Sequence, residues 1–150
     1  MSRTEQQRLV AQRRKARHYA LQALYQWQMA GARPTDIEAE FRTDYDFAAV
    51  DLEYFQAIVH GVPPLVDELD GLYTPFLDRP QSELDPIELA LLRMGSFELR
   101  ERIDVPYRVV INEAVALAKK FGAAESFKYI NGVLDRLARQ LRGPEVSASS

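Results

Sequence analysis

Apolar residues recur every three or four positions along almost the whole chain, and this spacing limits the fold more than any other feature of the sequence. It is the spacing of one face of an α-helix, and no convincing strand alternation is present. Glycine and proline separate the periodic segments, as they do at helix ends. We therefore predict seven helices. The first covers about residues 4–30, the second is short and begins near Thr35, and the third and fourth cover about residues 50–60 and 64–76. The fifth begins at Pro86 and ends before a turn at residues 103–106, and the last two cover about residues 106–121 and 125–141.

Two of the predicted helices begin with capping residues. Thr35 and Glu38 have the spacing of a capping box. Asp85, Pro86 and Glu88 place an acceptor, a proline and an acid where a helix start favours them. The helix that follows Asp85 is apolar most of the way around, which is typical of a buried central helix.

The chain has 150 residues, of which 47% are hydrophobic, enough for one domain with a sizeable core. A polar connector at residues 77–84, which contains Pro80, divides the domain into halves of about residues 4–76 and 85–142. The serine-rich tail beyond Arg142 is expected to be a frayed terminus. The predicted fold is all-α, a compact seven-helix bundle of two helical subdomains within a single domain over residues 1–150.

The composition argues against a metal-binding, secreted or membrane protein. There is no cysteine, and the two histidines, His18 and His60, are too few and too separated for a zinc site. We therefore expect no metal and no cofactor. No secretory signal and no apolar stretch of about 20 residues is apparent, so we expect a cytoplasmic protein without a membrane segment.

Positive charge is concentrated at the start of the chain. The first seventeen residues have a net charge of +5, whereas the whole chain is −3, so the remainder carries −8. Such segregation indicates a surface for a polyanion, although a solvated basic tail would show the same pattern. The charged residues are Arg3, Arg8, Arg13, Arg14, Lys15 and Arg17, against Glu5.

The position of Tyr25 favours nucleic acid as that polyanion. A rotation of about 100° per residue places Tyr25 in the same sector of the first helix as Arg14 and Arg17, opposite Trp27. Guanidinium groups neutralise phosphates, and an aromatic face stacks on an unpaired base. The alternative is a tyrosine packed beneath a neighbouring helix. The predicted core face is Leu9, Ala16, Ala20, Ala23 and Trp27, and Arg14, Arg17, His18, Leu21 and Tyr25 are predicted to face outward.

The last predicted helix has a second candidate surface. Tyr129, Gly132 and Arg136 lie on one flank, away from a core stripe that includes Phe127 and Ile130. Lys128 points to another solvent-facing side. A glycine inside a helix often permits close approach of another backbone, so tight packing within the bundle is the preferred interpretation of Gly132.

Catalytic motifs are missing from the sequence. The seven glycines are scattered rather than grouped in a phosphate loop, and no serine has the context of a nucleophile elbow. No candidate base is paired with a candidate nucleophile. The sequence therefore favours a binding protein over an enzyme.

Three segments resemble a known family. Residues 104–137, DVPYRVVINEAVALAKKFGAAESFKYINGVLDRL, resemble the C-terminal signature of the bacterial transcription antitermination protein NusB family. Residues 13–28, RRKARHYALQALYQWQ, resemble its opening helix, and residues 51–62 are similar to its middle. The resemblance implies a seven-helix protein with two helical halves, which agrees with the periodicity.

The resemblance also implies function and partners. NusB-like proteins bind the boxA element of nascent ribosomal-RNA transcripts as a heterodimer with NusE, a small-subunit ribosomal protein. The pair joins NusA, NusG and RNA polymerase in complexes that suppress premature termination. Glu88 aligns with an acid near the RNA and partner surfaces, although helix capping explains it equally well. The implied RNA-binding residues are Arg13, Arg14, Arg17, Tyr25, Glu125, Lys128 and Tyr129.

Two other classes stay open at this point. NusB-like folds also precede ribosomal-RNA cytosine methyltransferase domains, so the chain could be a helical accessory domain. Some relatives self-associate, so a protein-only adaptor that forms a homodimer in the absence of RNA is the second alternative.

Overall fold

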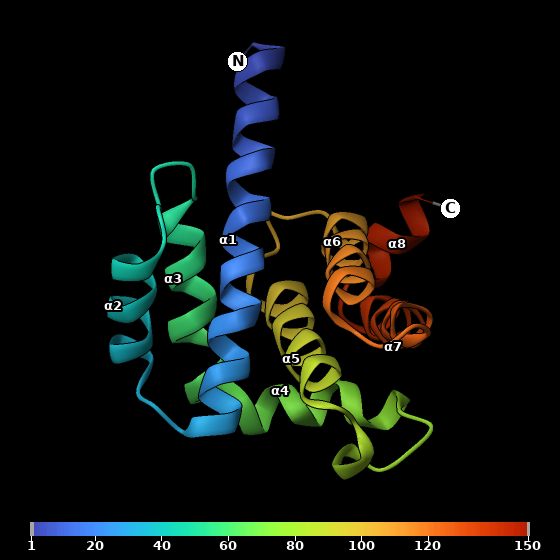
Figure 1. Ribbon diagram of the computed structural model, residues 1–150. Helices are drawn as coiled ribbons and strands as arrows, with labels where there is room; N and C mark the ends of the chain where they lie inside the picture. The colour runs from blue at the N-terminus through green and yellow to red at the C-terminus, as the bar shows by residue number, and fades with distance from the viewer. Residues whose placement is uncertain (1, 150) are drawn as a thin grey trace. The chain divides into compact units, whose positions relative to one another are not determined.

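The protein is built of α-helices (Figure 1). The computed structural model describes residues 2–149, and no strand occurs within that range. The all-α prediction is confirmed, and the seven predicted helices correspond to α1–α7. The helices of the described range are α1 (Arg3–Ala30), α2 (Pro34–Asp44), α3 (Leu52–Gly61), α4 (Val66–Tyr73), α5 (Pro86–Glu101), α6 (Tyr107–Phe121), α7 (Ser126–Leu141) and α8 (Gly143–Ser149), with 3-10 turns at Pro63–Leu65, Thr74–Phe76 and Gln81–Glu83.

The chain folds as two compact units, one ending at Pro63 and the other beginning at Pro64. Unit 1 contains α1–α3, and unit 2 contains α4–α8. The division thus precedes α4, upstream of the connector at residues 77–84 where the sequence analysis placed it. Helix α4 belongs with α5 because Arg93 of α5 donates two hydrogen bonds to Asp70 of α4, at 2.9 and 3.0 Å.

Helix α1 is the longest element of unit 1, with 28 residues. It begins with a capping box in which the Glu5 N–H donates to Ser2 Oγ at 3.1 Å. It ends at Gly31, as predicted, where φ is 69°, a left-handed conformation that favours glycine. The helix packs on α2 and α3, and its first turns extend beyond both (Figure 1).

The capping box predicted for α2 is wrong. The helix begins at Pro34, so Thr35 already lies in its first turn, and the N-cap Arg33 makes no side-chain capping bond. A proline at the first helical position sets the start by itself, because its φ is fixed and it has no N–H to satisfy. Glu38 instead joins α2 to α3: Gln56 donates to it at 2.9 Å, and His60 Nε2 lies 2.6 Å from its other oxygen.

Helix α5 is the buried centre of unit 2, as its apolar sequence predicts. It packs on α4, α6 and α7. A Cβ added at Gly95 would lie 2.8 Å from Leu134 Cδ1, so the glycine allows the side chains of α7 to approach the α5 backbone. The predicted cap is confirmed, because Asp85 Oδ1 accepts from the Glu88 N–H at 2.8 Å and Glu88 accepts from the Asp85 N–H at 3.2 Å.

The chain beyond Arg142 is helical, so the prediction of a frayed tail is wrong for residues 143–149. Two contacts hold α8. Arg142 is only 6% exposed and forms an ion pair with Glu145 at 2.9 Å. The other oxygen of Glu145 accepts the Tyr107 N–H at 2.8 Å, which satisfies one backbone donor at the start of α6.

Asp70 should make unit 2 sensitive to acid. Burial raises the pKa of this carboxyl, but hydrogen bonds from Arg93 and Tyr73 outweigh burial and hold the pKa below its usual value. Such a group contributes stability above the unfolded pKa, about 3.9, and loses it as the pH falls through the folded pKa. Asp70→Asn should therefore cost stability at neutral pH and progressively less below about pH 4. Thermal melts of both proteins across that range measure the difference, and a pH-independent difference would contradict the assignment.

Candidate nucleic-acid interface

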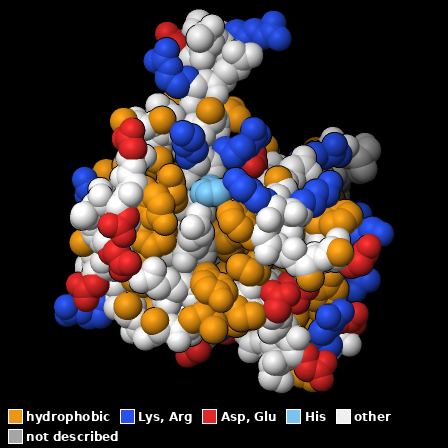
Figure 2. All heavy atoms as spheres, in the orientation of Figure 1, with side chains coloured by type: hydrophobic (Ala, Val, Ile, Leu, Met, Phe, Trp, Pro, Cys, Tyr) orange, Lys and Arg blue, Asp and Glu red, His pale blue; other side chains and the backbone are white. Residues whose placement is uncertain are grey.

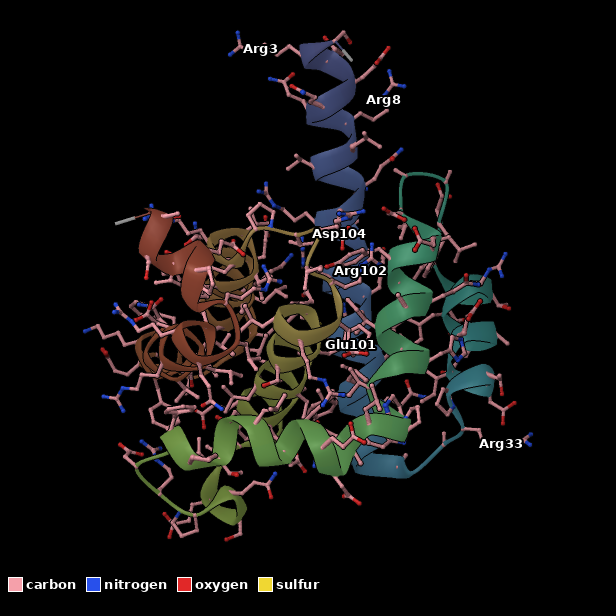
Figure 3. The ribbon with its side chains drawn as sticks, turned by 180° about the vertical axis from the view of Figure 1, so that it is seen from behind. Arg3, Arg8, Arg33, Glu101, Arg102 and Asp104 are labelled. Atoms are coloured by element: carbon pink, nitrogen blue, oxygen red, sulfur yellow. The ribbon has the colours of Figure 1, made fainter. Side chains whose placement is uncertain are left out.

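The basic start of the chain is a helix rather than an unstructured tail. Residues 3–11 belong to α1, and every one of them is exposed. The basic residues of this segment are Arg3 and Arg8, and Figure 3 shows both pointing away from the helix. Figure 2 shows basic side chains at this end of the molecule. Leu9 is also exposed here, contrary to its predicted place in the core, because neither α2 nor α3 reaches this part of α1. The cations are therefore held at helical spacing on an open surface.

Arg14 and Tyr25 share the outer face of α1. Tyr25 is 38% exposed, and Arg14 is exposed as well. They are eleven residues apart, which corresponds to about 16 Å along the axis and about 20° around it. The predicted exposure of Tyr25 is thus confirmed. This face offers one guanidinium and one aromatic ring.

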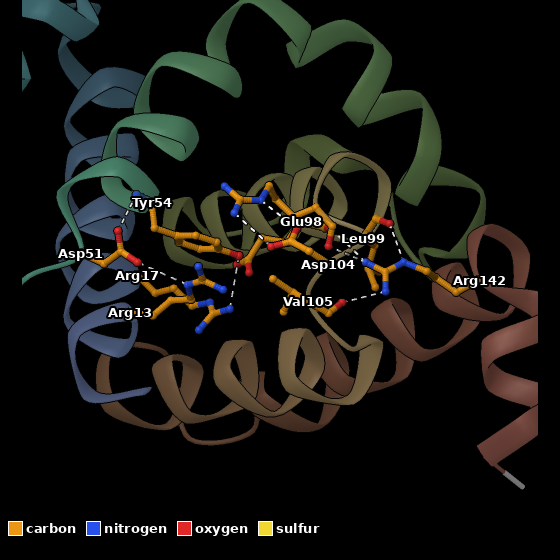
Figure 4. A network of polar contacts seen from close by, with 10 residues as sticks. Arg13, Arg17, Asp51, Tyr54, Glu98, Leu99, Asp104, Val105 and Arg142 are labelled. Carbon is orange, nitrogen blue, oxygen red and sulfur yellow. Dashed lines mark hydrogen bonds and ion pairs between the residues drawn. The ribbon is translucent and has the colours of Figure 1, made fainter. Parts of the chain in front are cut away.

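Arg17 does not belong to that face. It is 2% exposed, its Nη2 donates to Tyr54 Oη at 3.3 Å, and its Cζ lies 5.0 Å from the Tyr54 ring centroid (Figure 4). The prediction that Arg17 faces outward is wrong because α1 is buried over a wider arc than the apolar stripe suggests. Leu21 and Leu24 are buried alongside Ala16 and Ala20, and the arc covers about 160°.

Arg13 is partly engaged within unit 1. Its Nε lies 3.5 Å from Asp51 Oδ2, and its Cζ lies 4.3 Å from the centroid of the Tyr54 ring (Figure 4). Asp51 is also the N-cap of α3 and accepts the Tyr54 N–H at 3.1 Å. Arg13 is therefore half-buried at the edge of the basic segment, and it forms part of the contact between α1 and α3.

A second group of predicted residues lies at the start of α7, in unit 2. Glu125 and Lys128 are exposed and form an ion pair at 3.0 Å. Tyr129 is half-buried, and its hydroxyl accepts the Asp78 N–H at 3.2 Å. Burial, together with the charge of Asp78, raises the pKa of Tyr129, so its hydroxyl stays protonated. These residues present opposite charges and one aromatic ring.

Arg79 also belongs to this group, although no pattern in the sequence indicates it. Its Cζ lies 4.3 Å from the Tyr129 ring centroid, and Asp78 accepts its Nε–H at 2.7 Å. Arg79 and Tyr129 are fifty positions apart, and neither a motif nor helical periodicity connects them. Only the folded position of the 77–84 connector brings the two side chains together.

Glu88 and Gly132 occupy environments unlike those predicted for a partner surface or a helix contact. Glu88 is buried, and its second oxygen accepts a hydrogen bond from Ser126 Oγ at 2.9 Å. Capping therefore accounts for this acid better than partner binding does. Gly132 is exposed, and a Cβ there would meet nothing within 4 Å, so the tight-packing interpretation is wrong.

No group of three or more His, Cys, Asp or Glu side chains within residues 2–149 is arranged to hold a metal ion. No helix in the same range is long and apolar enough to cross a membrane.

Comparisons with known proteins agree with the fold. The NusB family model matches residues 14–139. Transcription antitermination protein NusB of Alcanivorax borkumensis is 63% identical over 135 residues, covering 90% of each chain, and that of Hahella chejuensis is 59% identical over 137 residues, covering 91% of this chain and 92% of its own. A solved structure of T. maritima NusB superposes with a TM-score of 0.66 at 26% identity, over 85% of this chain and 90% of that one.

The family resemblance seen in the sequence is thus confirmed by three independent comparisons. The names of the curated relatives denote a transcription factor rather than an enzyme, as the missing catalytic motifs predict. The match also includes most of α1 and most of α7, and both helices carry exposed candidate residues. This chain belongs to the NusB family.

Proposed function

We propose that this chain is a transcription antitermination factor that binds boxA RNA as a heterodimer with NusE. The pair would act in the cytoplasm with NusA, NusG and RNA polymerase to suppress premature termination. Family membership supports the general role, since the curated relatives are named as antitermination proteins. The observation that carries the RNA part is the exposed face of α1, on which Arg14 and Tyr25 lie about three turns apart.

The proposed recognition is that of a single strand. Cations of α1, including Arg14, contact phosphates and set the position of the RNA, and Tyr25 stacks on an unpaired base. On unit 2, Lys128, Glu125 and Tyr129 contribute a second group of RNA contacts. NusE extends the binding surface and so raises affinity and specificity. No covalent chemistry is involved.

Tyr25→Ala tests this proposal. Loss of a stacked base should weaken binding to boxA RNA by about 1–3 kcal/mol, or about 5- to 150-fold. Because the side chain is exposed, helicity and thermal stability should be unchanged. Fluorescence anisotropy titrations with boxA RNA and a scrambled sequence at one salt concentration, with NusE present, measure the effect.

Tyr45→Ala is the matched control. Tyr45 is also an exposed tyrosine of unit 1, but it lies just after α2 and not on α1, so this variant should bind boxA RNA like the wild type. Equal affinity of Tyr25→Ala and wild type would refute stacking by Tyr25. Equal affinity of the wild type for boxA and scrambled RNA would refute the proposed sequence preference.

A further inference from the structure

Arg79 and Tyr129 form a stacked pair on unit 2. The Arg79 Cζ lies 4.3 Å from the centroid of the Tyr129 ring, which is within the range of a cation–π contact. The side chain of Arg79 is 38% exposed, and Tyr129 is half-buried. One face of the ring is therefore covered by a guanidinium that is itself open to solvent on its outer side.

Asp78 fixes this guanidinium in place. Its Oδ1 accepts from Arg79 Nε at 2.7 Å, and its Oδ2 lies 3.5 Å from Arg79 Nη2, so both carboxylate oxygens face the planar group. Its backbone N–H donates to the Tyr129 hydroxyl at 3.2 Å. The hydrogen bond from Arg79 lowers the pKa of Asp78, so the pair stays charged over the neutral range. Residue 78 thus holds both members of the stack.

A fixed guanidinium plane is a surface for an unpaired base. Arginine planes stack on bases as aromatic rings do, whereas a lysine ammonium supplies only a point charge. Since Arg79 already covers one face of Tyr129, a base that approaches from this side meets the guanidinium before it meets the ring. Restriction of Arg79 by Asp78 reduces the entropy lost when the base stacks.

We infer that Arg79 and Tyr129 form one composite stacking site for an unpaired RNA base, with the base against the guanidinium and Asp78 as the positioning residue. The inference rests on the proposed function, because it assumes that the chain binds single-stranded RNA. It assigns Arg79 a base contact in addition to its contribution of charge. It also makes the connector at residues 77–84 part of the RNA-binding surface.

Arg79→Lys separates stacking from charge. The variant keeps the positive charge and loses the plane, so affinity for boxA RNA should fall by about 5- to 20-fold while the slope of log affinity against log salt stays that of the wild type. Stacking can be measured directly with a set of single-stranded RNAs, each of which carries the fluorescent base 2-aminopurine at a different position. At one of these positions the wild type should quench the 2-aminopurine fluorescence, and Arg79→Lys should restore it.

Arg139→Lys is the matched control. Like Arg79, Arg139 is exposed and forms an ion pair with an aspartate, Asp135, at 3.1 Å. It lies on α7, as Tyr129 does, but it contacts no aromatic ring in the described structure. The variant Arg139→Lys should therefore leave affinity and quenching unchanged. Asp78→Asn should reduce the quenching at the same position as Arg79→Lys, with an unchanged melting temperature, as expected of a positioning residue.

The outcomes distinguish this inference from the proposed function. Wild-type affinity and quenching with Arg79→Lys, in a protein that binds boxA RNA, would overturn the stacking site and leave the proposed function intact. Failure of the wild type to bind boxA RNA would overturn both. A salt slope that falls with Arg79→Gln, together with quenching that is unchanged with Arg79→Lys, would show that Arg79 contacts phosphate only, which also overturns the inference.

Discussion

Replacing Arg142 with methionine should lower the free energy of unfolding by about 3–5 kcal/mol. The guanidinium is buried and donates to the carbonyl oxygens of Leu99 and Val105, both at 2.8 Å (Figure 4). Two further donations reach the carbonyls of Glu98 and Arg102, at 3.2 and 3.0 Å. The carbonyls of Glu98 and Arg102 keep backbone donors, from the N–H groups of Arg102 and Val105. Methionine fills much of the volume but removes the guanidinium donor from the Leu99 and Val105 carbonyls, and each buried unsatisfied acceptor costs about 1–3 kcal/mol.

The loss should appear in two measurements. Chemical denaturation gives the change in free energy, and the melting temperature should fall by about 10 °C. Arg139→Met is the control, because Arg139 is exposed and its ion pair with Asp135 is worth less than about 1 kcal/mol. A variant Arg142→Met that melts within about 2 °C of the wild type would show that the carbonyls find other donors.

The elements that the sequence predicted well depend on neighbours within a few residues. The start of α5 is the best example, because Asp85 and Glu88 satisfy each other's backbone N–H groups across three positions. The end of α1 at Gly31 is likewise set by one residue that tolerates a positive φ. Such signals are local in the chain, so they can be identified without knowledge of the fold.

The features that the sequence did not reveal depend on contacts between distant residues. Arg142 reaches carbonyls about forty positions away, so its role as the tie between α5, the turn at 102–105 and α8 has no local pattern. The same is true of Arg79 and Tyr129, which meet only because of the path of the connector. Arginine side chains have long apolar stems, so they can be buried in the core or exposed at the surface, depending on the partners that the fold provides.

Arg17 shows the limit of helical projection for predicting a site. Projection placed Arg14 and Arg17 in one sector, and the structure places only Arg14 on the exposed face. An apolar stripe marks one buried side of a helix, but α1 is buried over a wider arc that includes a polar position. The exposed basic surface of α1 could therefore be predicted by segment and by residue type, although not residue by residue.

Substituting methionine at Arg14 and at Arg17 should produce opposite effects. Arg17→Met should lower the free energy of unfolding by about 2–4 kcal/mol, because the Tyr54 hydroxyl loses a charged donor and its ring loses a buried cation. The salt dependence of RNA binding by the folded variant should match the wild type. Denaturation curves and anisotropy titrations on the same protein measure both quantities.

Arg14→Met should instead keep the stability of the wild type, since Arg14 is exposed and methionine is a good helix former. The slope of log affinity against log salt should fall by about 0.7, the value for one phosphate contact on a single strand. The two variants differ by only three positions on one helix and remove the same charge, so net charge alone predicts the same slope for both. A reduced slope with Arg17→Met and unchanged stability would show that Arg17 leaves Tyr54 to contact phosphate, and the buried assignment would then fail.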